Sequence, residues 1–173
     1  MSTESKNSEP VLHSPYERIR HAHLFQFADH IEKSSSTGSE DALFCVISTF
    51  PLSDSAQAAL HASAPRLGYS NRQLCFIVLS NASHTLEPSE LFTMIEAIDP
   101  LCIVLTDHES VKTASAGYNT PLTLEAREFL LGRSCCCFES FEDLLSTSEG
   151  KQKAWACLKT LLPLAVLRHN SRG

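Results

Sequence analysis

Residues 101–109, Leu101-Cys102-Ile103-Val104-Leu105-Thr106-Asp107-His108-Glu109, decide the fold class of this 173-residue chain. The stretch begins with an unbroken apolar run, which indicates a strand buried on both faces, as in a parallel sheet covered by helices. It continues directly into a helix-capping pattern at residues 106–109. A strand followed at once by a helix is the repeating unit of an α/β fold with crossover connections.

Three further apolar runs have the same character, at residues 43–47, 74–79 and 135–138. The first leads to a helix that we expect from Asp54 to near Gly68, with a capping box at residues 54–57. The second leads to a helix over residues 88–98, which Asp99-Pro100 ends, and the helix after residue 106 should close at Gly117. We therefore predict a three-layer α/β sandwich, a mostly parallel four-stranded sheet covered by helices on both faces.

The remaining elements are a helix at each end and one ambiguous segment. The tetrad Ser14-Pro15-Tyr16-Glu17 predicts the start of a helix whose apolar face continues to Ile31. Residues 123–131 suit a short helix capped by Gly132, although their apolar residues also permit partly extended structure. Residues 149–162 predict a last helix, with Trp155 on its apolar face and Pro163 after its end.

The composition is that of a folded globular protein, with 43% hydrophobic and 20% charged residues. We predict a disordered tail over residues 1–12, a single α/β domain over residues 13–168 and a flexible C-terminus over residues 169–173. The net charge of -6 makes a broad electrostatic partnership with nucleic acid unfavourable. No stretch approaches the roughly 20 consecutive apolar residues that a membrane span requires, so we expect no membrane partner and a cytoplasmic location.

The cysteines suggest neither disulfides nor a metal site. They are seven in number and most lie inside apolar runs, without any C-x-x-C pair, so we expect buried, reduced thiols. Residues 48–54, which follow the first strand, contain no glycine, although close approach of backbone to phosphate requires one. The sequence therefore predicts no cofactor.

Polar side chains follow the predicted strands at the points where ligands usually bind in open α/β sheets. The candidate ligand-binding residues are Thr49, Phe50, Asn81, His84, Asp107 and His108. Such residues are the raw material for acid–base chemistry or for binding a polar ligand. A structural explanation also stands: Thr106 or Asp107 as a helix cap, Asn81 as a turn residue, and both histidines as solvated loop residues.

Three features together carry a family resemblance. Leu67-Gly68-Tyr69 precedes the second strand, Asn81 follows it, and residues 98–107 begin with Ile98-Asp99-Pro100 and end with Thr106-Asp107. Over about residues 43–118 the chain resembles the uracil-DNA glycosylase superfamily, in which a strand ending in Asn is followed by a helix and a Pro-led strand. The resemblance implies that Asn81 stands at the position of that strand-end Asn.

Two catalytic features of this family have no counterpart in the chain. Residues 48–54 lack its water-activating motif, and Glu139-Ser140-Phe141 stands where its late His-Pro-Ser-type loop would be. The resemblance therefore implies the fold without the catalysis. A similar reduced fold occurs in the psi subunit of the bacterial replicase clamp loader, a protein connector.

The favoured hypothesis is a non-catalytic interaction or adaptor module with a protein partner or a second copy, in a setting of DNA replication or repair. No catalytic residue is assigned. The apolar residues beyond Pro163, namely Leu164, Val166 and Leu167, are the candidate interface. The alternative is an enzyme or a small-ligand binder that uses the polar residues at the strand ends.

Overall fold

A computed structural model describes residues 26–31, 42–161 and 163, which include a five-stranded sheet in the order β2-β1-β3-β5-β4. The strands are β1 (Phe44–Ser48), β2 (Leu74–Val78), β3 (Cys102–Leu105), β4 (Ala126–Leu130) and β5 (Arg133–Cys137). All neighbours pair in parallel except β4, which is antiparallel to β5. The predicted α/β class is confirmed, while the predicted four strands are joined by a fifth.

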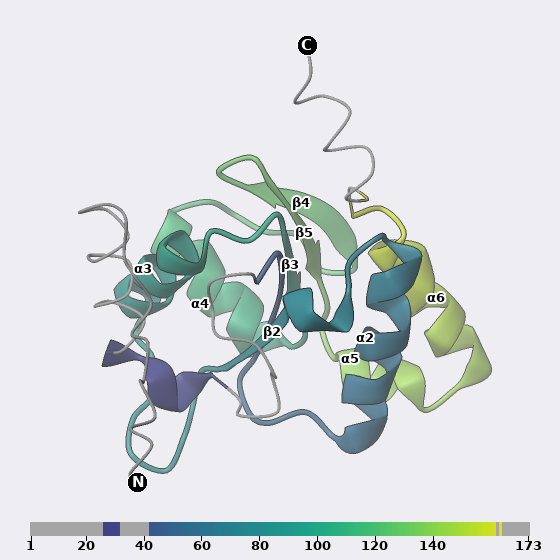
Figure 1. Cartoon of the computed structure of the whole chain (residues 1–173), viewed down its shortest axis with the longest axis horizontal. Helices are drawn as coiled ribbons and strands as arrows, with labels where there is room; N and C mark the ends of the chain where they lie inside the picture. Colours follow the sequence, from purple (N-terminus) through teal and green to yellow (C-terminus); the bar gives the residue numbers. More distant parts are fainter. Residues whose placement is uncertain (1–25, 32–41, 162, 164–173) are drawn as a thin grey trace, which may run out of the picture.

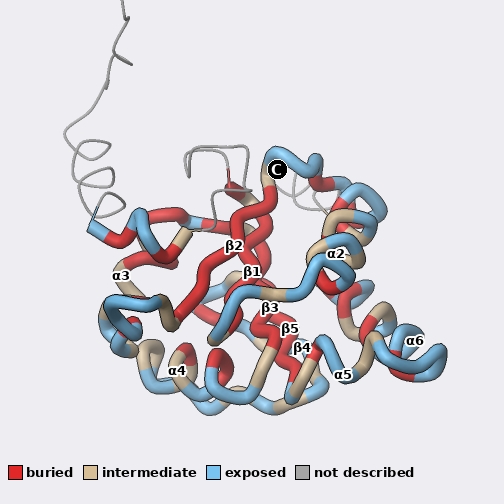
Figure 2. Tube along the Cα trace, turned by 90° about the horizontal axis from the view of Figure 1, so that it is seen from below, coloured by how far each residue is buried: buried red, intermediate tan, exposed pale blue. Residues whose placement is uncertain are grey.

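Helices cover both faces of the sheet (Figure 1). Helices α3 (Pro88–Ile98) and α4 (His108–Tyr118) pack on one face, and α2 (Asp54–Arg66), α5 (Phe141–Leu145) and α6 (Ser148–Leu158) pack on the other. The 3-10 turns η1 (Ala28–His30) and η3 (Asn71–Gln73) complete the described elements. Figure 2 shows the strands other than β4 buried between helices whose outer surfaces are exposed, so two apolar cores share one sheet.

Most predicted helices are present, with changes at their ends. Helix α3 has the predicted bounds, but the N-cap of α2 is Ser53, whose hydroxyl accepts the Ala56 N–H, so the predicted capping box at residues 54–57 is wrong. Helix α6 ends at Leu158 and not at residue 162, because the N–H groups of Thr160 and Leu161 bond three residues back and tighten the chain into a final turn.

Of the two possibilities left open for residues 123–131, the helix is wrong and extended structure is present, because this segment contains strand β4. Leu131 and Gly132 both have positive φ, 47° and 84°, and join β4 to β5 as a two-residue hairpin turn. Such turns need left-handed backbone at both central positions, which glycine adopts at no steric cost. Gly132 is therefore a turn residue and not a helix cap.

The two edges of the sheet differ. At the β4 edge, the Arg127 guanidinium lies 4.7 Å from the ring centroid of Phe129. Beside β2, Ile31 is extended and forms an antiparallel bridge with Ile77. The prediction of helix as far as Ile31 is therefore wrong at its end, since the chain here borders the sheet.

Six of the seven cysteines are buried, as predicted for the strand positions, and Cys157 is half-buried. Burial raises the pKa of Cys102 to about 11. A hydrogen bond with the Cys75 thiol, together with burial, raises the pKa of Cys45. A hydrogen bond with Cys136 instead lowers the pKa of Cys157.

Several predictions concern residues outside those described: the helix start at Ser14, the tails at residues 1–12 and 169–173, and the candidate interface Leu164, Val166 and Leu167. Within residues 26–31, 42–161 and 163, no helix is both long and apolar enough to cross a membrane.

Candidate binding site

The carboxylate of Asp107 ties the ends of β1 and β3 together. It accepts hydrogen bonds from the Thr49 N–H at 2.7 Å, from the Thr49 hydroxyl, and from the Ser110 N–H at 2.8 Å. The last of these makes Asp107 the N-cap of α4. Since both carboxylate oxygens are already engaged, Asp107 is a structural tie between strand ends and not an available general base.

A hollow of about 360 Å³ lies beside this tie, at the carboxyl ends of β1, β3 and β5. The Phe50 side chain forms one wall and is 67% exposed. The carboxylates in the lining are Asp107, Glu109, Glu139 and Glu142, and no lysine or arginine within residues 26–31, 42–161 and 163 lines the hollow. Among the described residues, His108 is the only basic side chain in the lining. Its Nδ1 lies 3.0 Å from Glu139 Oε2. We name this acidic cavity the strand-tip hollow.

A second hollow of about 440 Å³ shares Phe50 with the first and is lined by Asn81 and His30. His30 is buried, and its Nδ1 donates to the Val78 carbonyl oxygen at 2.7 Å. The Asn81 amide nitrogen lies 3.3 Å from His30 Nε2, while its Oδ1 accepts the N–H groups of Ser83 and His84. The amide of Asn81 thus closes a turn and fixes a histidine.

His84 lies outside both hollows and belongs to the start of α3. Its Nε2 is 2.8 Å from Glu90 Oε2. The Glu87 N–H and the His84 ring hold the pKa of Glu90 below its usual range. This contact explains His84 as part of the helix terminus.

The predicted site residues are therefore divided between places. Thr49, Phe50, Asp107 and His108 meet at the strand-tip hollow. Asn81 lies beyond Phe50, together with His84, whose N–H donates to Asn81 Oδ1 and whose ring centroid lies 5.8 Å from that of His30. Glu109, Glu139 and Glu142 also line the hollow but are not among the candidate residues named from the sequence, although Glu139 directly follows a predicted strand. Glu142 has no comparable signal, because its Oε1 accepts the N–H of Ser53, 89 positions earlier in the chain, at 2.6 Å.

The chemistry of the strand-tip hollow is that of an acidic, partly aromatic binding surface. Across the described part of the chain, no group of three or more His, Cys, Asp or Glu side chains is arranged to hold a metal ion. No protein-family model matches the chain, and comparison with the curated proteins gave no match. The arrangement of the site is thus the evidence on function.

Proposed function

We propose that this protein is a non-catalytic interaction module, an adaptor whose strand-tip hollow receives a basic side chain of a protein partner. The observation that carries the proposal is the charge of the hollow: its described lining holds four carboxylates and no lysine or arginine beside an exposed Phe50 ring. A guanidinium or ammonium group would pair with the carboxylates and lie against the ring face, an arrangement worth about 0.5–1 kcal/mol at exposed sites.

The adaptor role is supported by the engagement of the polar groups that a catalyst would need. The Asp107 carboxylate and the Asn81 carbonyl oxygen each accept at least two hydrogen bonds from the protein itself. A cytoplasmic location belongs to the same proposal, and the free thiols of the described cysteines support it.

The test measures binding of two labelled random hexapeptide pools by fluorescence anisotropy, one with a fixed central Arg and one with a fixed central Glu. We expect the Arg pool to bind more tightly, with affinity that falls as salt screens the carboxylates. Phe50→Ala and Glu139→Gln should each weaken binding about threefold. Asp99→Asn also removes one negative charge, but Asp99 precedes β3 at the opposite end of the strand, so binding should not change.

Equal binding of the two pools would refute the proposed site. Free L-arginine serves as a competitor in the same assay. If it displaces the Arg pool as effectively as an Arg peptide does, the hollow is a small-ligand site and the adaptor proposal fails.

We also propose that the fold is a reduced form of the uracil-DNA glycosylase-like fold, connected with replication or repair. The position of Asn81 after β2 supports the proposed fold. The side-chain oxygen of Asn81 accepts two backbone N–H groups of its own turn, which supports the loss of catalysis. We predict that the purified protein leaves uracil-containing single- and double-stranded DNA without abasic sites above the buffer level. Turnover that disappears in Asn81→Ala would contradict this prediction.

A further inference from the structure

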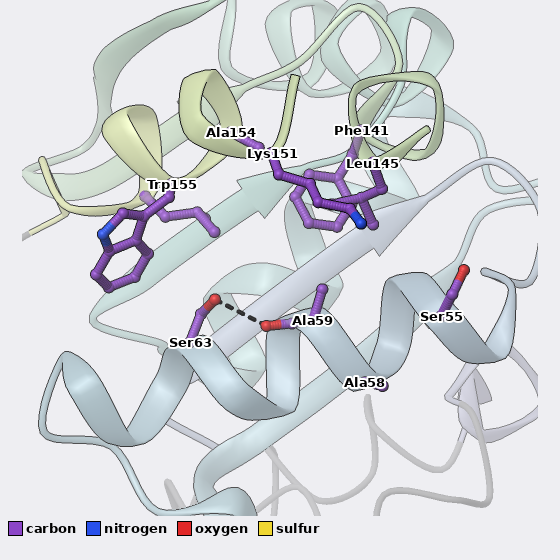
Figure 3. A pocket seen from close by; sticks show the side chains of 10 residues that line it. Ser55, Ala58, Ala59, Ser63, Phe141, Leu145, Lys151, Ala154 and Trp155 are labelled. Carbon is purple, nitrogen blue, oxygen red and sulfur yellow. Dashed lines mark hydrogen bonds between the residues drawn. The ribbon is translucent and has the colours of Figure 1, made fainter. Parts of the chain in front are cut away.

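A second surface, unconnected with the proposed strand-tip site, lies between α2 and α6 (Figure 3). It is a groove of about 480 Å³. Ala58, Ala59 and Ser63 line it from α2, Lys151 and Trp155 line it from α6, and the buried Phe141 lies between the two helices.

The groove exists because α6 packs against α5 and α2 presents small side chains across the gap. Gly150 lets α6 approach so closely that a Cβ there would lie 2.0 Å from the Leu144 carbonyl oxygen. On the opposite wall, the Ala59 side chain reaches only a short way toward α6. An apolar side chain from outside can therefore enter between the helices and contact Trp155.

Two cations border the groove, Lys151 and Arg66. Among the described residues, Lys151 is the only charged one in the lining, and it has no ion-pair partner there. The guanidinium of Arg66 lies 5.5 Å from the ring centroid of Trp155, at the end of α2. Both cations border an apolar groove in a chain whose net charge is -6. This local reversal of sign is the chemical feature that a partner would complement.

We propose that this groove binds an amphipathic helix of a protein partner, with acidic residues at both ends of its apolar face. Apolar side chains spaced along one helix face would fill the space beside Ala59 and Trp155, which is the common way in which a helix occupies a groove. The terminal carboxylates would pair with Lys151 and Arg66. The strand-tip hollow takes no part in this contact.

The experiment uses Trp155 as the reporter, because it is the only tryptophan in the chain. The probe is a helical peptide of about 16 residues with Leu on one face and Glu at both ends, and the matched probe carries Lys in place of Glu. We expect the Glu peptide to shift the Trp155 emission to shorter wavelength, since the indole loses water. The Lys peptide should bind at least about fivefold more weakly.

Two variants of the full-length chain locate the contact. Lys151→Glu should weaken binding of the Glu peptide about threefold to tenfold and reduce or reverse the preference between peptides. Ala59→Leu should block the groove with a side chain that favours helix, and should lower affinity while the circular dichroism spectrum stays unchanged. Lys112→Glu is the control, because it makes the same charge change on α4, on the other face of the sheet.

Three results would overturn the proposal. One is an equal response to the two peptides, or a preference that Lys151→Glu leaves unchanged. Another is a Trp155 emission that changes with protein concentration together with dimer formation, which would assign the groove to a second copy. The last is a shift to longer wavelength in the full-length variant with Leu164, Val166 and Leu167 changed to Asp, which would assign the groove to the chain's own C-terminal segment. Failure of the Arg-peptide experiment at the strand-tip hollow bears on none of these results.

Discussion

Gly150 allows α5 and α6 to pack without any space between their backbones. A Cβ at this position would lie 2.0 Å from the carbonyl oxygen of Leu144 and 2.7 Å from its carbonyl carbon. Backbone atoms cannot move aside as a flexible side chain can, so the helices would have to separate. The groove beside Trp155 depends on this close packing, because it fixes the position of α6.

Gly150→Ala is therefore expected to destabilise the fold, against the gain of about 1 kcal/mol that alanine gives over glycine inside a helix. Overpacking of this kind costs about 1–3 kcal/mol. Urea denaturation measures the free energy of unfolding, with Gln152→Ala at an exposed position of the same helix as control. A Gly150→Ala protein as stable as the original would mean that the helices separate at no cost.

Asp107 joins two strand ends and caps a helix with one carboxylate. Asp107→Ala removes the acceptor of the Thr49 and Ser110 N–H groups and should cost about 1–3 kcal/mol of unfolding free energy. Asp54→Ala is the matched control, since Asp54 lies in the first turn of α2 and Ser53 is the cap there. The control should lose only a few tenths of a kcal/mol. Equal losses in thermal or urea denaturation would show that Asp107 acts through its charge alone.

The turn between β4 and β5 contains a residue type that is unusual for its backbone conformation. Leu131 is 69% exposed and has a φ of 47°, in the left-handed region where L-residues other than Asn and Asp are disfavoured. With Gly132 next to it, Asn at this position would give the pair that two-residue hairpin turns prefer.

Leu131→Asn should consequently stabilise the protein by about 0.5–1 kcal/mol. Leu131→Ala provides the control, because it removes the exposed side chain and keeps an ordinary L-residue in the left-handed conformation. The two variants are compared by chemical denaturation. A gain shared equally by the Ala variant would trace the effect to the exposed leucine side chain and not to the turn.

Helices and strands were predictable where one strong local signal defined both ends. The bounds of α3 follow from Pro88 at its start and Asp99-Pro100 after its end. β4 was not predictable, because a two-residue turn at Leu131-Gly132 looks in sequence like a helix followed by its C-terminal glycine. α5 spans only Phe141–Leu145, too short for a helical period to show.

The functional surfaces were predictable only in part, since they depend on contacts between distant segments. The carboxyl ends of neighbouring parallel strands lie at the same edge of the sheet, and Thr49 and Asp107 are hydrogen-bonded there. Only the three-dimensional structure shows that this contact occupies the Asp107 carboxylate, and only the structure shows where Glu142 lies. Trp155 was expected in the apolar stripe of the last helix, and the groove beside it follows from the small residues of α2, which carry no sequence signal of their own.

At the scale of the molecule, buried thiols are spread over four parallel strands and both cores. Cys45, Cys75, Cys135 and Cys137 belong to the core under α3 and α4, while Cys102 and Cys136 belong to the other. Hydrogen bonds with neighbouring thiols, together with burial, hold the pKa of Cys45, Cys135 and Cys136 above the ordinary 9.0, and burial raises the pKa of Cys102. The folded protein thus retains thiol protons that the unfolded chain releases in alkali.

The contribution of these thiols to stability should be constant below about pH 8 and should fall as the pH rises past the ordinary thiol value of 9.0 toward the pKa of about 11 of Cys102. Each such thiol contributes a slope of up to about 1.4 kcal/mol per pH unit. Urea denaturation under reducing conditions between about pH 7.5 and 9.5 measures this slope, because the two limits lie roughly one unit below and above the ordinary pKa of a thiol. Cys102→Ala should reduce the slope; stability unchanged at the upper pH would exclude this linkage.

The edge of the sheet at β4 has a consequence for the behaviour of the protein in concentrated solution. An edge strand is a template on which the strand of another chain can add, and successive additions give fibrous aggregates. Phe129 is 48% exposed at this edge, and the Arg127 guanidinium over its ring places a positive charge where a second chain would have to approach. Arg127 thus serves as a gatekeeper residue, which protects solubility more than it contributes to folding.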